Sequence, residues 1–274
     1  MKKISEDLKL EICNYYLSFP QSIGEVSEYF GISKVTISKI LKEKGCRVYS
    51  RQELFNIGTN ETFFEYIETE QQAYFLGLLI ADGCVFKTKL NNYRILLALQ
   101  EADGYMIEIF KKLLHINRTV VKDKRDNSYS ITVTSNKMAI DLSKYGVVPN
   151  KTFKTFLPIL SDNLMPHLIR GLIDGDGNIG YRKRNQKQDL NIKNVRGQVA
   201  FCGSELIVNQ LRDFLVEKLN VYPAKIIKEG NIFSVRWNSK QDILLICNYI
   251  YSSATIYLKR KKEKFIFLNK LISS

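Results

Sequence analysis

The sequence predicts an α+β fold in which one αββαββα unit occurs twice, preceded by a small all-α domain. A short motif at Tyr74–Gly83 recurs 94 residues later (Gly77 to Gly171), which indicates a duplication. Segments typical of strands and of amphipathic helices follow both copies in the same order. The first fifty residues show only helical periodicity. Two such units joined through their motif helices would form a saddle of two antiparallel sheets with pseudo-twofold symmetry.

Each copy of the motif is a short apolar segment with small residues at positions i and i+4, followed by Asp and Gly. The members are Gly77, Ala81, Asp82 and Gly83 in the first copy and Gly171, Gly175, Asp176 and Gly177 in the second. Small residues one turn apart form a flat stripe that lets two helix backbones approach closely. We therefore expect the two motif helices to pack together, with a Gly ending each of them.

This packing would place Asp82 and Asp176 side by side at helix C-termini. The negative end of the helix dipole and a neighbouring carboxylate both disfavour ionisation. A divalent cation would relieve that conflict, and such oxygen-rich ligation suits Mg²⁺, with water and phosphate completing the shell and Mn²⁺ as a substitute. One copy alone would be read as a buried core helix with a Gly cap, but matching offsets in two copies favour a site.

These residues resemble the LAGLIDADG signature of homing endonucleases, in its two-motif single-chain form. The first copy has Ile80 where the signature has its first Asp, whereas the second keeps both, as Asp174 and Asp176. The resemblance implies that Asp82 and Asp176 hold the catalytic metals, and it gives Asp174 no metal role. Gly83 and Gly177, or their neighbours, are expected to add backbone carbonyls to the metal site.

The composition indicates a globular protein that binds a polyanion. The chain has 274 residues, 45% of them apolar, and a net charge of +13. Nucleic acid fits this charge better than a membrane does, because no apolar run reaches the ~18 residues of a membrane span. The N-terminus lacks a signal-peptide core, so a cytoplasmic protein is expected. With both copies of the motif in one chain, a monomer is expected. Five scattered cysteines indicate neither a disulfide framework nor a zinc site.

The elements after each motif follow one order: two strands, a helix, two strands and a helix. In the first unit they are expected at residues 84–86, 93–100, 106–114, 119–122, 129–134 and 138–145; in the second, at 178–182, 198–202, 207–219, 224–228, 232–237 and 243–251. Aligning the last strands makes Lys137 and Lys240 equivalent. By resemblance, a basic residue near this place supports the attacking water, so both are candidate catalytic residues; the alternative is two helix-start lysines at the surface.

The first fifty residues predict a helix-turn-helix. Ser5 and Ser33 are suited to cap helices, Gly31 provides a turn, and Pro20 ends the first helix. The last helix would present polar residues to a major groove. These are Lys34, Thr36, Ser38, Lys39 and Lys42. A three-helix packing module is the alternative. The domains are thus expected at 1–50, with a linker at 51–70, and units at 71–150 and 151–274.

Further DNA-binding residues are expected in hairpin loops and at alternating strand positions of the sheets. They are Arg94, Lys124, Arg125, Arg182, Arg184, Arg196, Gln198 and Arg236. Together these features predict a Mg²⁺-dependent double-strand DNA endonuclease with a nearly asymmetric target. Two alternatives stay open: a non-cleaving transcription regulator on the same scaffold, and a splicing maturase that binds intron RNA. Retention of Asp82 and Asp176 favours the nuclease.

Overall fold

The computed structural model describes residues 4–18, 21–49, 53–54, 57–151, 154–183 and 195–273. The chain divides into two compact units. The first comprises Met1–Asn60 with His115–Arg118, and the second Glu61–Leu114 with Thr119–Ser274.

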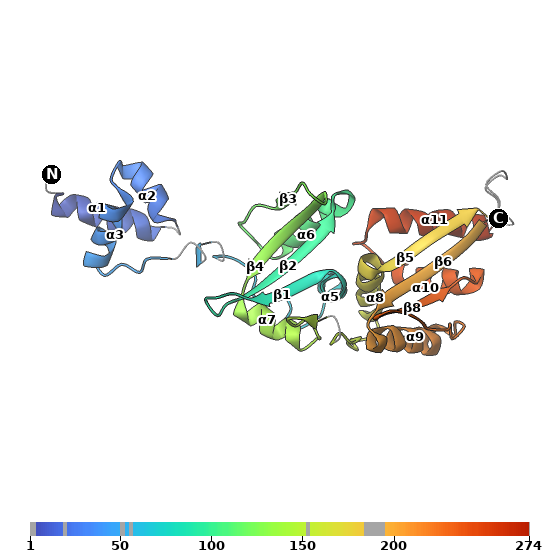
Figure 1. Cartoon of the computed structure of the whole chain (residues 1–274). Coiled ribbons are helices and arrows are strands. Elements are labelled where there is room, and N and C mark those ends of the chain that lie inside the picture. Colours follow the sequence, from blue (N-terminus) through green and yellow to red (C-terminus); the bar gives the residue numbers. More distant parts are fainter. Residues whose placement is uncertain are drawn as a thin grey trace. The chain divides into compact units, whose positions relative to one another are not determined.

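The first unit is built on three helices, α1 (Glu6–Ser18), α2 (Ile23–Phe30) and α3 (Lys34–Glu43) (Figure 1). Local signals set their ends. Gly31 adopts the left-handed conformation (φ 64°) that closes α2, and the Ser33 side chain accepts from the Thr36 N–H at the start of α3. The apolar faces of the helices form a shared core. Its buried members are Ile12, Cys13, Tyr16, Val26, Ile37, Ile40 and Leu41.

The second unit contains the αββαββα order twice, which confirms the predicted duplication. Its first half consists of α5 (Glu70–Ala81), β1 (Gly83–Lys87), β2 (Tyr93–Gln100), the short 3₁₀ helix η1 (Glu101–Asp103), α6 (Gly104–Leu113), β3 (Val121–Asp123), β4 (Ser128–Thr134) and α7 (Asn136–Ser143). Its second half consists of α8 (Met165–Asp176), β5 (Gly177–Lys183), β6 (Val195–Gly203), α9 (Glu205–Leu219), β7 (Ile227–Glu229), β8 (Ile232–Trp237) and α10 (Lys240–Tyr251), followed by α11 (Lys259–Ser273).

Each half forms a four-stranded antiparallel sheet, in the order β1-β2-β4-β3 or β5-β6-β8-β7. Gly83 pairs with Leu97 in the first sheet and Gly177 with Phe201 in the second, so the two registers match position by position. Along β2, alternate residues such as Ile95 are buried against the helices, while the intervening ones line the opposite face. Each sheet therefore has one face packed on helices and one less covered face.

The linker is shorter than the sequence suggested. Of the expected span 51–70, residues 61–70 belong to the second unit. Phe63 and Phe64 are buried there, and the Phe64 ring contacts that of Phe110. Burial of these two rings is the physical reason, since a solvated linker would leave them exposed. The expected strand at 224–228 also begins later, at Ile227.

No helix in the described ranges is long and apolar enough to cross a membrane. All five cysteines are free thiols, as expected.

Candidate active site

The two motif helices, α5 and α8, touch backbone to backbone. A Cβ atom added to Gly77 would lie 2.2 Å from the Leu168 carbonyl oxygen, and one added to Gly171 would lie 2.1 Å from that of Tyr74. Real carbon atoms do not approach oxygen so closely, so only glycine fits at either position. The predicted stripe of small residues is therefore the contact between the helices.

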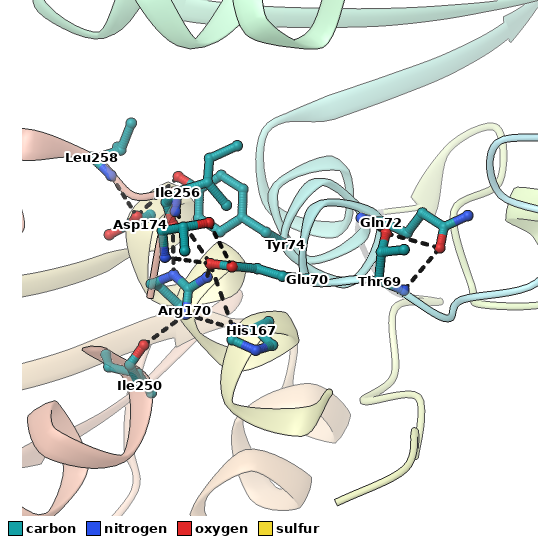
Figure 2. A network of polar contacts seen from close by, with 11 residues as sticks. Thr69, Glu70, Gln72, Tyr74, His167, Arg170, Asp174, Ile250, Ile256 and Leu258 are labelled. Atoms are coloured by element: carbon teal, nitrogen blue, oxygen red, sulfur yellow. Dashed lines mark hydrogen bonds and ion pairs between the residues drawn. The ribbon is translucent and has the colours of Figure 1, made fainter. Parts of the chain in front are cut away.

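A buried polar network also joins the same helices (Figure 2). Arg170 of α8 is fully buried, and its guanidinium donates to Glu70 of α5 at 2.6 Å and to the carbonyls of Ile250 and Ile256 at 2.7 and 2.8 Å. Glu70 also accepts from Thr255, which lies between α10 and α11. This buried ion pair is hydrogen-bonded on several sides, which fixes α5 relative to α8.

Asp174, the first Asp of the second motif, is part of this network. It is fully buried, and its carboxylate accepts from the hydroxyls of Tyr74 and Tyr251 at 2.9 and 3.0 Å and from the Leu258 N–H at 2.8 Å. Burial raises its pKa. With its oxygens occupied by these donors, Asp174 has a structural role between α5, α8 and the segment before α11.

Asp82 and Asp176 meet where the paired helices end. Asp82 caps α5 and Asp176 is the last residue of α8. A Cβ on Gly175, the neighbour of Asp176, would lie 3.1 Å from Asp82 Oδ2. Both side chains reach solvent, but the surrounding protein limits their hydration. Reduced solvation and the nearby charge of Asp176 raise the pKa of Asp82 to about 6, and reduced solvation raises the pKa of Asp176.

Two lysines bind the carbonyls at the ends of the same helices. Lys151 Nζ donates to the carbonyls of Leu79, Ile80 and Ala81 at the end of α5. Lys261 Nζ donates to those of Ile173, Asp174 and Gly177, at 2.6, 2.5 and 2.7 Å, at the end of α8. Each ammonium satisfies carbonyls that lack helical partners. Burial lowers the pKa of both lysines to about 8. The negative charges of the nearby carboxylates oppose this shift: Asp82 acts on both lysines, Asp176 on Lys151 and Asp174 on Lys261.

The two carboxylates open into different cavities. Asp82 lines a cavity of about 340 Å³ together with Gln100, Asp103 and Arg260. Asp176 lines one of about 250 Å³ together with Lys151 and Cys202. The site is therefore double, with one Asp in each cavity.

No protein-family model and no curated protein matches this sequence. Solved structures do match. One is the I-LtrWI LAGLIDADG homing endonuclease bound to target DNA, with 14% identity over 78% of this chain and 92% of that chain, and a TM-score of 0.51. Another is the meganuclease I-CpaMI bound to uncleaved DNA, with 12% identity over 76% and 92% of the two chains and a TM-score of 0.54. This chain has the LAGLIDADG endonuclease fold.

I-SmaMI, bound to an uncleaved DNA target in the presence of calcium ions, has the same LAGLIDADG fold, with 14% identity over 74% of this chain and 93% of that chain and a TM-score of 0.51. These similarities cover most of each compared chain. They agree with the paired motif helices and the two sheets described above.

The donor atoms of the LAGLIDADG motif ends suit a hard divalent cation. Asp82 and Asp176 provide two adjacent carboxylates. Within the described residues, no cluster of three or more His, Cys, Asp or Glu side chains is arranged to hold a metal. Mg²⁺ commonly binds through one or two carboxylates and completes its shell with water and substrate phosphate. The pair thus fits Mg²⁺ that is bound together with a phosphate-bearing substrate.

The motif glycines serve the turn from each helix into its strand. The Gly177 carbonyl also accepts a hydrogen bond from Lys261. A Cβ on Gly83 would lie 2.5 Å from the Leu79 carbonyl, and one on Gly177 would lie 2.6 Å from that of Ile173. Neither backbone is left-handed. Both glycines are needed because the strand turns back tightly against its own helix.

Lys137 and Lys240 are not the lysines at the acid pair. Lys137 pairs with Asp141 at 2.7 Å and with Glu65 at 3.0 Å, and Lys240 is the first residue of α10. The cations that act on Asp176 are instead Lys151 and Lys261. The sequence gives little signal for these two lysines, because each lies far along the chain from its motif Asp and at a different separation in each half. Lys151 follows Asp82 by 69 residues (151 minus 82), and Lys261 follows Asp176 by 85 (261 minus 176). The interpretation of Lys137 and Lys240 as helix-start lysines agrees with the structure.

The less covered face of the second sheet gathers three of the predicted DNA-binding residues. Arg196, Gln198 and Arg236 line one cavity of about 970 Å³. The matching face of the first sheet carries Arg94, whose Nε is buried and has no hydrogen-bond partner among the described residues. In register, Arg236 corresponds to Thr132 and Gln198 to Arg94, so the two faces carry different residues at matching positions.

The remaining predicted contacts lie elsewhere. Lys124 and Arg125 are exposed in the turn between β3 and β4, where Arg125 pairs with Asp123. Arg182 belongs to β5 and pairs in register with Arg196, whereas Arg184 lies outside the described residues. On α3, the side chains of Lys34, Lys39 and Lys42 are exposed, and those of Thr36 and Ser38 are half-buried.

Proposed function

We propose that this chain is a site-specific double-strand DNA endonuclease that hydrolyses phosphodiester bonds with Mg²⁺. The observation that supports this best is the meeting of Asp82 and Asp176 at the ends of two paired helices, each beside a lysine. The net charge of +13 agrees with a polyanionic substrate. Structures with this fold are described as homing endonucleases bound to DNA, which supports the same substrate here.

Asp82 and Asp176 would hold the metal ions, and the bound metal would supply Lewis acidity and a water nucleophile. The protein's own contribution is charge and position. Lys151 and Lys261 are fixed by helix carbonyls and have pKa values of about 8. At neutral pH both remain mainly protonated, so each would favour a phosphate at the acid pair.

The less covered faces of the two sheets would contact the DNA. Arginine recognises guanine and glutamine recognises adenine through paired hydrogen bonds in the major groove. Arg196, Gln198 and Arg236 on one sheet, and Arg94 on the other, would make such contacts. Since the two faces carry different residues at matching positions, the target would not be a palindrome.

The first unit would act as a helix-turn-helix that holds DNA beside the nuclease unit. Its α2–turn–α3 arrangement and the exposed Lys34, Lys39 and Lys42 support this. It would add affinity through tethering without taking part in the chemistry.

The experiment is a cleavage selection on a randomised DNA library, followed by kinetics on the selected site. Asp82→Asn and Asp176→Asn are expected to abolish cutting while duplex binding stays within a few-fold. Mg²⁺ or Mn²⁺ should support cutting, and Ca²⁺ should support binding only, because its coordination is looser. Lys240→Gln serves as a charge-changing control outside the acid pair, and it should cut normally.

Full cutting by both Asp variants would refute the endonuclease. Binding of one DNA sequence without cutting in any metal would identify a regulator on this scaffold. Preferential binding of structured RNA over the selected DNA would identify a maturase.

A further inference from the structure

The two acid sites differ in a way that the duplicated fold does not require. The residues that precede the corresponding helices α6 and α9 differ: they are Asp103 in the first half and Ser204 in the second. Asp103 lines the Asp82 cavity, and Ser204 lines the Asp176 cavity. Lys151 and Lys261 are equivalent helix-end lysines, so the residue before each can also be compared. It is Asn150 in one half and Arg260 in the other.

Arg260 crosses from the second half of the unit to the acid site of the first. It comes from α11, yet it lines the Asp82 cavity. Its Nε donates to Asp103 Oδ2 at 2.8 Å, and the Asp103 side chain is only 3% exposed whereas that of Arg260 is 45% exposed. A buried carboxylate thus anchors one edge of the guanidinium, and much of the side chain stays open to the cavity.

The remaining edge of the guanidinium is available for a ligand. Within the described part of the chain, the Nε contact is the one hydrogen bond found for this side chain. The charge of Arg260 acts on Asp82 across the cavity. A guanidinium fixed through Nε can present its two terminal nitrogens to a phosphate in a paired geometry. The Asp176 cavity has Lys151 as its cation, and the uncharged Ser204 occupies the position that Asp103 has in the first half.

We infer that Arg260 is a phosphate-contacting residue at the Asp82 site and that Asp103 positions it, so that the two DNA strands are cut by chemically unequal sites. This inference rests on the proposed endonuclease function. Loss of Arg260 should slow one strand selectively, because no guanidinium lines the Asp176 cavity among the residues that the structure describes. The wild-type enzyme should therefore pass through a nicked intermediate with one preferred strand.

The test uses the full chain and the DNA site selected above, with a different fluorescent label on each strand and single-turnover rates measured in Mg²⁺. Arg260→Gln should lower the rate of one strand by roughly ten- to a hundredfold, as for the loss of one charged donor to a reacting group. The other strand should change by less than about twofold on the same grounds. Arg260→Lys should restore part of the lost rate, since it returns the charge without the fork.

Asp103→Asn should slow the same strand, by less than Arg260→Gln does. The matched control is Lys259→Gln, which removes an exposed positive charge from the adjacent position of α11 and should leave both strands at the wild-type rate. Binding in Ca²⁺ and thermal midpoints confirm that each variant is folded and bound. If Arg260→Gln slows both strands equally, or neither, the inference is overturned while the endonuclease stands. If the wild-type protein cuts neither strand of DNA that it binds, both fail.

Discussion

Gly77 and Gly171 face each other where α5 crosses α8, and a Cβ on either glycine would lie 3.0 Å from the Cα of the other. This contact brings the helix axes as close as backbones allow. The ends of the helices, with Asp82 and Asp176, are close together as a result.

Replacing Gly77 or Gly171 by Ala should therefore destabilise the second unit. The added methyl group would overlap backbone atoms that cannot move independently, at a cost of about 1–3 kcal/mol in the free energy of unfolding. Chemical denaturation measures this. Gly180→Ala in β5 is the control, because there a Cβ meets only the end of the Asn178 side chain, at 3.2 Å. Equal stability of all three variants would contradict the helix contact.

Asp82→Asn should stabilise the metal-free protein at pH 7.5. The folded-state pKa of about 6 exceeds the ordinary value of 3.8, so wild-type stability falls as pH rises through this window, and the loss is complete above it. A full shift of this size corresponds to about 3 kcal/mol, and we expect about 1 kcal/mol because the carboxylate reaches solvent.

The measurement is the thermal midpoint of wild type and Asp82→Asn between pH 4 and pH 8. The advantage of the variant should vanish near pH 4 and shrink when Mg²⁺ is added at pH 7.5. A pH-independent difference would show that Asp82 has an ordinary pKa. Cutting by the wild type should likewise decline below pH 6, since a protonated Asp82 binds metal weakly.

Lys151→Met and Lys261→Met should both abolish cutting, whereas Lys137→Met and Lys240→Met should cut at nearly the wild-type rate. The first pair removes the cations beside the acids, and the second pair removes lysines at the starts of α7 and α10. Lys261→Met should also lower stability by about 1–3 kcal/mol, because several buried carbonyls lose their donor. Normal cutting by Lys151→Met would restore the case for the other lysines.

Arg170→Met should be among the most destabilising single changes, at about 3–5 kcal/mol, because it leaves Glu70 with an uncompensated charge in a largely buried position. Adding Glu70→Gln should recover part of the loss. A double-mutant cycle on the free energy of unfolding isolates the coupling. Additive effects would mean that the pair in Figure 2 contributes no coupling of its own.

A chain that begins at Thr59 should cut the same phosphates with weaker binding. Removal of the three-helix unit deletes the proposed tethered interaction, and Lys39→Ala and Lys42→Ala in the full chain should reproduce part of the effect. The slope of affinity against salt should fall by roughly one for each lysine–phosphate interaction that is removed. Footprinting is the check: an unchanged protected length and affinity would favour a protein partner for α1–α3.

The sequence by itself determined the duplication, the order of the elements and the two acids. Those features are local or repeated: small residues at i and i+4 define a helix stripe, alternation defines strands, and Asp82 and Asp176 hold the same place in both copies. A helix stripe that packs against its own copy can do so in few arrangements. The sequence therefore also predicts that Gly77 and Gly171 lie at the contact between the two helices.

The tertiary structure alone decided which cations serve those acids. Lys151, Lys261 and Arg260 come from segments outside the repeated pattern, 69 to 85 residues beyond the motif Asp of their own half (151 minus 82 and 261 minus 176 for the lysines). Their approach depends on the paths of the connections after α7 and α10, which differ between the halves. Periodicity fixes neighbours within a few residues, whereas contacts across such separations follow from how the whole unit packs.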